Sequence, residues 1–275
     1  NCAAVEFQRK MDNDKSDGEN IYTIVRDTFI DLGVVFFGGY AFSLYSRKMP
    51  KKEQQFIQKI PDFDVLSEDI EKTALIIEER LRDANFKDIT QIHHDAIGEI
   101  IPEHIEIQYK KETMAFIYKP MACHNYNTIQ INDMDVNVAT IDTIMSFYLA
   151  FLYAGTDYYF KDRILCMAKY LFELEQKNRL SQDGVLKRFT SKCMGTQETL
   201  ESIRAKKSKK YESLRGKRGT EEYEKFFLRY SPSDNAKKKI DTEKKPEKKS
   251  EKKSEKKSEK KTEKKSEPFK LPAFM

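Results

Sequence analysis

The sequence lacks the features of several protein classes. It contains no uninterrupted stretch of about 18 apolar residues, so we expect no membrane-spanning helix and no membrane partner. The first residues do not show the charged-then-apolar order of a secretory signal. The cysteines are far apart and form no Cys-x-x-Cys pair; they are Cys2, Cys123, Cys166 and Cys193. This spacing argues against a zinc ribbon or a disulfide framework and predicts a reducing, cytoplasmic location.

Charge is abundant in the chain and unevenly distributed. Lys and Arg number 50 against 45 Asp and Glu, which gives a net charge of +5, and 39% of the 275 residues are hydrophobic. The positive charge is concentrated in the segments 204–229 and 237–270, so residues 1–203 are acidic. An acidic body that can bury a core is therefore followed by a basic C-terminal third.

Patterning along the chain predicts an α+β fold with a small mixed sheet, flanking helices and a later helical section. We expect a frayed segment at 1–18, a first domain at 19–139, a helical domain with a basic segment at 140–230, and a disordered tail at 231–275. The tail repeats Lys, Glu and Ser every four residues and has no apolar side chains to bury. The chain begins with Asn1 rather than methionine, so the sequence leaves open whether it is a fragment of a longer protein.

Hydrophobic periodicity places the individual elements. A helix is predicted to follow Ser67 as its N-cap and to run from Glu68 to Asp83. Two more helices are predicted on either side of Gly155, at Ile141–Tyr153 and Tyr158–Leu174. Strand signals occur at Val34–Phe37, Phe63–Leu66, Ile89–His93, Ile105–Tyr109, Ala115–Tyr118 and within Thr128–Val138.

Two acidic residues at the start of a strand carry the sharpest chemical signal. Asp62 and Asp64 alternate with Phe63, so their carboxylates share one face of the strand. Two carboxylates this close repel each other unless a cation lies between them, and Mg²⁺ or Mn²⁺ suits such oxygen ligands. A lone Asp-x-Asp pair is also common at solvated strand ends, so the surrounding pattern has to decide.

That pattern contains a phosphate-binding turn and candidates for a third acid. Gly38 and Gly39 end an apolar strand and lead into a helix, where backbone N–H groups can approach phosphate oxygens. Glu106, between two isoleucines, is the first choice for a third metal-binding carboxylate, and Asp135 is the alternative. Taken singly, a Gly-Gly turn or an exposed strand glutamate would be ordinary.

With these residues in place, the sequence resembles the polymerase-beta-type nucleotidyltransferases. The resemblance rests on Phe37-Gly38-Gly39 followed by Asp62-Phe63-Asp64-Val65, and it extends more loosely to about Lys177. Within that superfamily the chain looks most like the poly(A) polymerase catalytic subunits of large DNA viruses. The resemblance implies a nucleotidyltransferase fold, two divalent metal ions and the transfer of a nucleoside monophosphate from a nucleoside triphosphate such as ATP.

The resemblance also assigns roles to residues. Asp62, Asp64 and Glu106 would hold the metals, and Glu106 would help to activate the attacking hydroxyl. Gly38 and Gly39 would hold the triphosphate. Tyr40 stands where many relatives carry Ser or Thr, so further phosphate contacts would come from the backbone or Ser43. Lys161 and Arg163, at the start of a helix, could meet the triphosphate or could form a solvated helix face.

The basic segment Arg204–Arg218 predicts binding to nucleic acid with little sequence preference, although a nuclear-localisation or solubilising segment fits it equally well. We therefore expect an enzyme that adds adenylates to RNA 3′ ends, located in the host cytoplasm or virion if it is viral. A homodimer or a processivity partner stays open. The alternatives are another acceptor (tRNA, protein or a small molecule) or a catalytically inactive RNA-binding or partner subunit.

One predicted helix carries a row of aromatic residues. We expect them to belong to the core rather than to form a base-stacking platform; they are Phe147, Tyr148, Phe151 and Tyr153.

Overall fold

The structure is a computed structural model that describes residue 2 and residues 15–54, 61–155 and 159–227. The chain divides into two units, Asn1–Ser233 and Asp234–Met275, and every described residue belongs to the first. The predicted Lys/Glu/Ser tail at 231–275 lies outside the described residues, as does most of the predicted frayed segment at 1–18. No helix in the described ranges is long and apolar enough to cross a membrane.

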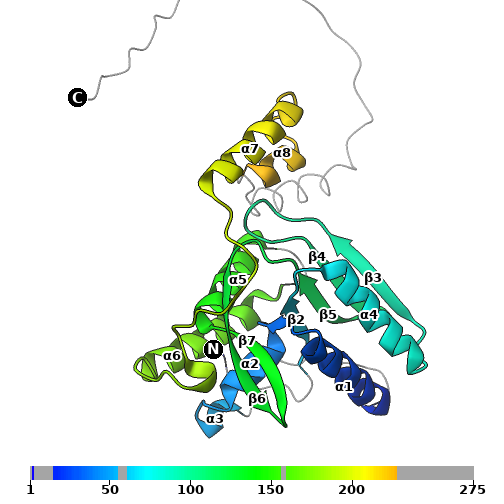
Figure 1. The fold of residues 1–275 in the computed structure, drawn as a ribbon, viewed down its shortest axis with the longest axis vertical. Helices are drawn as coiled ribbons and strands as arrows, with labels where there is room; N and C mark the ends of the chain where they lie inside the picture. Colours follow the sequence, from blue (N-terminus) through cyan, green and yellow to red (C-terminus); the bar gives the residue numbers. More distant parts are fainter. Residues whose placement is uncertain (1, 3–14, 55–60, 156–158, 228–275) are drawn as a thin grey trace, which may run out of the picture. The chain divides into compact units, whose positions relative to one another are not determined.

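The described strands form a mixed sheet in the order β3-β4-β5-β2-β1-β7-β6-β8 (Figure 1). The central pairs β2–β5 and β1–β7 are parallel, and the remaining pairs are antiparallel. The strands are β1 (Val35–Phe36), β2 (Phe63–Leu66), β3 (Ile89–His94), β4 (His104–Tyr109), β5 (Glu112–Tyr118), β6 (His124–Ile131), β7 (Met134–Ala139) and β8 (Cys193–Met194). The alternating Thr128–Val138 segment is thus a hairpin of two strands, with Asn132 and Asp133 at positive φ in its turn.

The helices follow the predicted pattern with shifted ends. They are α1 (Lys15–Asp31), α2 (Gly39–Ser46), α3 (Lys51–Gln54), α4 (Ile70–Asp83), α5 (Ile141–Ala154), α6 (Lys161–Lys177), α7 (Leu200–Leu214) and α8 (Glu221–Phe226), with a 3₁₀ turn at Gly184–Leu186. The prediction that Ser67 caps the N-terminus of α4 was wrong. The side chain of Asp69 accepts from the backbone N–H of Lys72, so the helix begins at Ile70, two residues later than expected. Ser67 instead shares a hydrogen bond of 2.8 Å with Thr73.

Strand β2 separates two differently covered faces of the sheet. On one face, Phe63 contacts Phe29 and Tyr22 of α1, and α4 packs beside α1 over β4 and β5 (Figure 1). On the other face, Phe37 stacks on Phe147 of α5 with 4.4 Å between ring centroids. Phe63 and Val65 therefore point to the α1 side, and Asp62 and Asp64 point to the α5 side.

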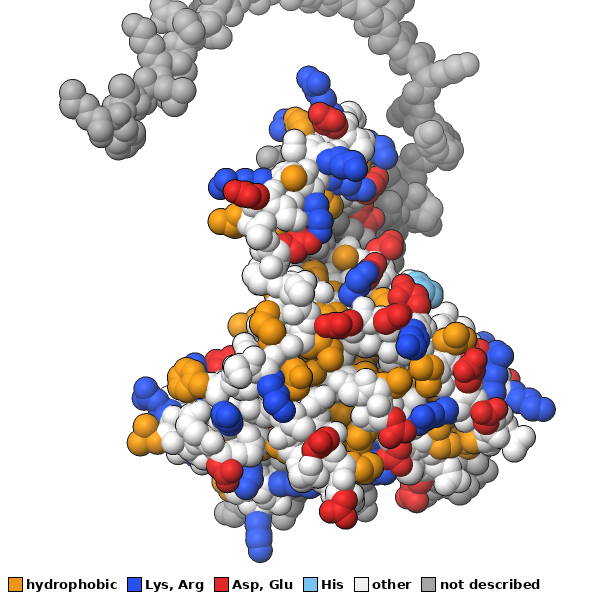
Figure 2. All heavy atoms as spheres, in the orientation of Figure 1, with side chains coloured by type: hydrophobic (Ala, Val, Ile, Leu, Met, Phe, Trp, Pro, Cys, Tyr) orange, Lys and Arg blue, Asp and Glu red, His pale blue; other side chains and the backbone are white. Residues whose placement is uncertain are grey.

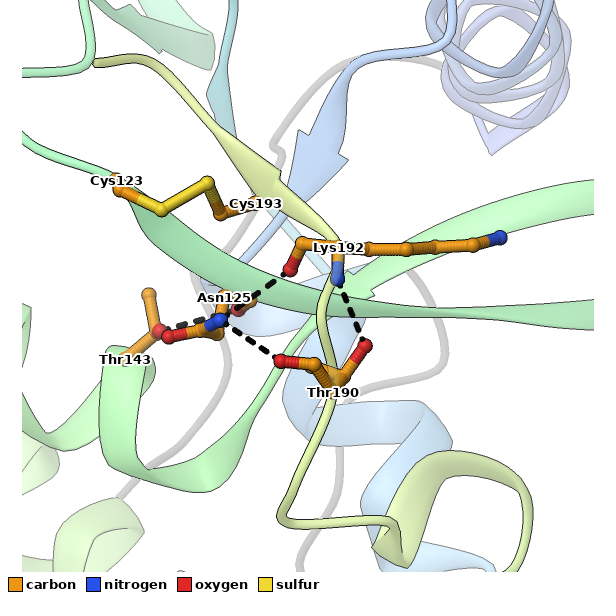
Figure 3. The surroundings of a disulfide bond; sticks show 6 residues. All are labelled: Cys123, Asn125, Thr143, Thr190, Lys192 and Cys193. Carbon is orange, nitrogen blue, oxygen red and sulfur yellow. Dashed lines mark hydrogen bonds between the residues drawn. A yellow bond between two sulfur atoms is a disulfide. The ribbon is translucent and has the colours of Figure 1, made fainter.

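The cysteines contradict the expectation of a protein without disulfides. Cys2 is bonded to Cys166 of α6, and Cys123 is bonded to Cys193 of β8. Spacing along the chain did not reveal this pairing because each bond joins residues that only the fold brings together, 164 and 70 positions apart. Around the second bond, the Asn125 side chain donates to the backbone oxygens of Thr190 and Lys192 (Figure 3). These hydrogen bonds hold the segment that leads into β8 against β6.

The last two described helices are short of buried apolar side chains. In α7 only Leu214 is buried, and its Tyr211 is partly exposed at 40%. Lys and Arg side chains gather over the part of the molecule formed by α7 and α8, with Asp and Glu among them (Figure 2). These helices are therefore a charged surface, not a second core.

Candidate active site

The Gly-Gly turn and the acidic pair are joined through the backbone. The N–H groups of Phe37 and Gly38 donate to the carbonyl oxygen of Asp64 at 2.9 and 3.3 Å, and the N–H of Tyr40 donates to that of Asp62 at 3.2 Å. These bonds hold the start of α2 directly against the carboxylates. The two parts of the motif, more than twenty residues apart in sequence, therefore lie in direct contact.

Glycine is required at both turn positions because there is no room for a side chain. A Cβ atom on Gly38 would overlap the carboxylate of Asp64, and one on Gly39 would overlap the carboxylate of Asp62. The N–H groups of Gly39 and Ala41 lie in the first turn of α2, where a helix supplies no internal acceptor. The turn can therefore bring backbone donors close to an anion that sits beside the two acids.

Arg163 of α6 contributes a cation to the acidic pair. One of its guanidinium nitrogens lies 2.7 Å from the Oδ1 atom of Asp62, and the two side chains are only 13% and 12% exposed. Burial acts to lower the pKa of Arg163, but the charges of Asp62 and Asp64 outweigh it and raise that pKa. The guanidinium is thus held charged at the carboxylates. Lys161, two residues earlier, is exposed and does not line this cavity.

Tyr148 of α5 adds a hydroxyl that has no hydrogen-bond partner in the described part of the chain. Its side chain lines the cavity with Asp62, Asp64 and Arg163. Complete burial, then the charge of Asp64, raises the pKa of the phenol well above its ordinary value, so the hydroxyl keeps its proton. A buried donor without a partner costs about 1–3 kcal/mol, and a bound ligand that accepts this proton would remove the cost.

The cavity around these groups is small and has aromatic walls. Its volume is about 50 Å³, far below the 300–1,000 Å³ of typical ligand pockets. Besides the acids, Gly39, Tyr148 and Arg163, its lining consists of Phe116, Phe151, Tyr159, Phe160, Ile164 and Met167. The hydroxyls of Tyr118 and Tyr159 are 2.8 Å apart and hold the wall in this position. A nucleotide could enter only after side chains of this wall, or Arg163, move.

Glu106 does not join Asp62 and Asp64. Asp64 is paired across the sheet with Phe116 of β5, and Phe116 is paired with Glu106 of β4. Glu106 therefore lies on the same face but two strands away, at roughly 10 Å, with Phe116 between. Within the described ranges, no group of three His, Cys, Asp or Glu side chains is placed to hold a metal.

The carboxylate of Glu106 is occupied by neighbours on its own part of the sheet. It accepts hydrogen bonds from Thr113, from Gln108 at 2.8 Å and from the ring of His94 at 2.9 Å. Burial acts to raise the pKa of Glu106, but these hydrogen bonds outweigh it and lower that pKa. Glu106 is consequently an ionised centre of a separate polar cluster.

Two other predicted residues also lie elsewhere. Asp135, the alternative third acid, is exposed on β7 and contacts Gln130. Ser43 lines a cavity on the α1 side of β2, and its hydroxyl donates to the backbone oxygen of Tyr40 at 2.7 Å. The structure therefore brings together Asp62, Asp64, Gly38, Gly39 and Arg163, and it separates Glu106, Asp135, Ser43 and Lys161 from them.

The residues that are brought together fit a divalent cation. Mg²⁺ is commonly bound by one or two carboxylates and takes its remaining ligands from water and substrate phosphates. Asp62 and Asp64 supply such a pair, the turn at Gly38 and Gly39 lies directly against them, and Tyr148 offers an unused donor. Arg163 stands in for the cation by neutralising Asp62.

Comparison with solved structures supports the same fold. The chain superposes on the crystal structure of the Megavirus polyadenylate synthase with a TM-score of 0.57 and 13% sequence identity. The chain has a nucleotidyltransferase fold. The alignment covers 88% of this chain and 51% of the Megavirus chain, so the chain spans about half the length of that relative. No protein-family model and no curated protein matches the sequence.

Sequence reasoning missed two residues that shape the site. Tyr148 was predicted to be core, and the ring is buried as expected, but its hydroxyl faces the acids. The signal available in the sequence was a tyrosine between Phe147 and Phe151, because a buried tyrosine has a hydroxyl that needs a partner. Phe116 had no signal, because its position beside Asp64 depends on the pairing of β2 with β5, which are about fifty residues apart.

Proposed function

We propose that the chain is a metal-dependent nucleotidyltransferase that adds adenylates from ATP to RNA 3′ ends without a template. The observation that carries the proposal is the contact of the Asp62–Asp64 pair with a turn, Gly38-Gly39, that has no room for side chains. The shared fold of a polyadenylate synthase adds support at the level of architecture.

Each group in the cavity has a role in this proposal. A divalent cation bound by Asp62 and Asp64 would polarise the reacting phosphate and stabilise charge on the entering and leaving oxygens. The N–H groups of Gly39 and Ala41 orient the phosphates, and Arg163 exchanges Asp62 for a phosphate oxygen. The hydroxyl of Tyr148 donates to the bound nucleotide, and the aromatic wall excludes water.

The basic helices support an RNA acceptor. Helix α7 carries four lysines between Lys206 and Lys210, of which Lys206 and Lys209 are exposed. Several are paired with acids: Lys206 with Glu198, Lys207 with Glu99 at 2.8 Å and Lys210 with Glu222 at 3.5 Å. Exposed pairs of this kind contribute little and are screened by salt, so a polyanion can compete for the lysines. We expect RNA binding that weakens steeply as salt concentration rises.

The decisive experiment supplies the chain with Mg²⁺ or Mn²⁺, an RNA primer and each of the four nucleoside triphosphates in turn. Extension of the primer with ATP, and its loss in Asp64→Asn, would support the proposal. The matched control is Asp135→Asn, which removes an exposed carboxylate from the same sheet. Offering tRNA, protein or a small molecule in place of the primer distinguishes the acceptors.

A second candidate is a catalytically inactive subunit that binds nucleotide or RNA through the same fold. It is favoured by Phe116, which stands beside Asp64 where a third carboxylate could reach a metal, while Glu106 is bound elsewhere. Nucleotide binding that needs the divalent cation, without extension of any acceptor, would support this candidate. In that case Phe116→Asp is the variant expected to gain activity.

Location and partners are part of the proposal. We propose a cytoplasmic or virion location and keep a homodimer or a processivity partner as hypotheses. Because disulfides are rare in reducing compartments, alkylation of the purified protein's thiols followed by mass spectrometry should accompany any test of location. Light scattering at several protein concentrations would measure the oligomeric state.

A further inference from the structure

A second, larger cavity lies on the opposite side of β2 from the acids. Its volume is about 390 Å³, within the range of small-molecule sites. It is lined by Tyr22 and Arg26 of α1, by the α2 region from Tyr40 to Arg47, and by the turn of the β6–β7 hairpin. Tyr22 and Tyr40 both pack against Phe63, whose side chain points away from Asp62 and Asp64.

The charged groups that line this cavity are two arginines. Arg26 forms an ion pair with Asp27 at 2.7 Å, which occupies one side of its guanidinium. Arg47 is exposed and has no hydrogen-bond or ion-pair partner among the residues that the structure describes. Both guanidiniums are close enough to the hydroxyls of Tyr22 and Tyr40 to lower the pKa of each, although burial outweighs them and keeps both phenols protonated.

The other polar groups narrow the kind of ligand. Ser43 and Ser46 already donate their hydroxyl protons to backbone oxygens of α2, and Gln54 donates to Met49. The remaining side-chain donors are the two guanidiniums, the two phenol hydroxyls, the amide of Asn132 and the second N–H of Gln54. No carboxylate lines the cavity in the described part of the chain. The lining therefore offers protons and positive charge to an acceptor-rich, anionic ligand.

We infer that this arginine cavity, defined by Tyr22, Arg26, Tyr40, Arg47 and Asn132, binds a phosphate group of a nucleotide at a site distinct from the acid cavity. Arg26 and Arg47 contact the phosphate oxygens, and the tyrosine hydroxyls donate to the same group. The volume accommodates a nucleotide unit, either free or within an RNA chain. This site needs no divalent cation, and its function does not depend on catalysis at Asp62 and Asp64.

The test is calorimetric titration of the full chain in EDTA, which removes divalent cations from the acid cavity. Two probes distinguish the sources of phosphate: ADP has terminal phosphates, and the dinucleotide ApA has only an internal phosphodiester. Binding of either probe is expected, and Arg47→Gln should weaken it about tenfold or more, since a charge-assisted hydrogen bond is lost. Asp64→Asn should leave it unchanged.

Lys48→Gln is the matched control, because Lys48 is the exposed neighbour of Arg47 and loses the same charge outside the cavity. Arg26→Gln should behave as Arg47→Gln does, with thermal unfolding measured to show that the variant is folded. The inference is overturned if neither probe binds in EDTA, or if Lys48→Gln weakens binding as much as Arg47→Gln. It is also overturned if binding needs Mg²⁺ and disappears in Asp64→Asn.

Discussion

The acid cavity and the arginine cavity are built on the two sides of one strand, and they differ in almost every property. The first is small, lined by carboxylates and aromatic rings, and closed by an arginine from α6. The second is several times larger and lined by guanidiniums and hydroxyls from α1 and α2. The alternation of Asp62, Phe63 and Asp64 places both carboxylates on one face of the sheet and the ring of Phe63 on the other. The four-residue strand β2 thus separates the acid cavity from the arginine cavity.

Loss of one carboxylate should affect only the first cavity and should have the largest effect. Asp64→Asn is expected to lower the rate of nucleotide transfer about a thousandfold or more, because the metal contributes several kcal/mol to the transition state. The measurement is primer extension with ATP and Mg²⁺. Binding of ADP in EDTA should stay at the parent value, and a loss of both together would show that the two cavities are not distinct.

The disulfide between Cys123 and Cys193 links the start of β6 to β8 at the edge of the sheet. Replacing both cysteines with alanine should lower the free energy of unfolding by about 2–4 kcal/mol, since a bond that closes a 70-residue loop restricts the unfolded chain. Urea unfolding of the oxidised parent and the double variant measures the difference. Reduction also breaks the bond between Cys2 and Cys166, so the parent and the variant should become equally stable only when both are reduced. Equal stability of the two oxidised proteins would contradict a formed bond between Cys123 and Cys193.

The pH dependence of stability should come from a buried histidine on the face of the sheet that carries the acid cavity. His104 is buried on the face that carries Asp64 and Glu106, and burial lowers its pKa from 6.5 to about 4. Below pH 6.5 this histidine therefore binds a proton in the unfolded chain, whereas in the folded chain it stays neutral down to about pH 4. Stability should fall by about 2 kcal/mol between pH 7.5 and pH 5.

Denaturant unfolding across that pH range provides the measurement. His104→Phe keeps a ring between His94 and Tyr118 and should flatten the slope. His93→Gln, at an exposed neighbouring position, should leave the slope as it is in the parent. An unchanged slope in His104→Phe would assign the pH dependence to another group.

Tyr148 gives the smallest but most diagnostic effect. Tyr148→Phe removes a buried hydroxyl without a partner, so unfolding stability should stay the same or rise by up to about 1 kcal/mol. The affinity for ATP with Mg²⁺ should nevertheless fall about tenfold. In the control Tyr45→Phe, the lost hydroxyl donates to Ala139 at 2.8 Å. That variant should lose stability and keep its affinity for ATP.

The sequence predicted the acid cavity better than the arginine cavity, for a physical reason. Strand alternation around Phe63 and the Gly-Gly turn are local patterns, so Asp62, Asp64, Gly38 and Gly39 could be assigned together. The site of Glu106 depends on which strands pair, and a local pattern does not specify that β5 comes between β2 and β4. Arg26 and Arg47 are in separate helical segments and share no motif, so their convergence emerges only from packing.

The hydrogen bond from the N–H of Tyr40 to the carbonyl of Asp62 crosses the boundary between the two cavities. Tyr40 lines one cavity and Asp62 lines the other, so a ligand that moves either residue alters the free energy of binding at the second site. Linkage makes such an effect reciprocal. A cation that binds at Asp62 would change the affinity of the arginine cavity by the same factor as a phosphate there changes the affinity for the cation.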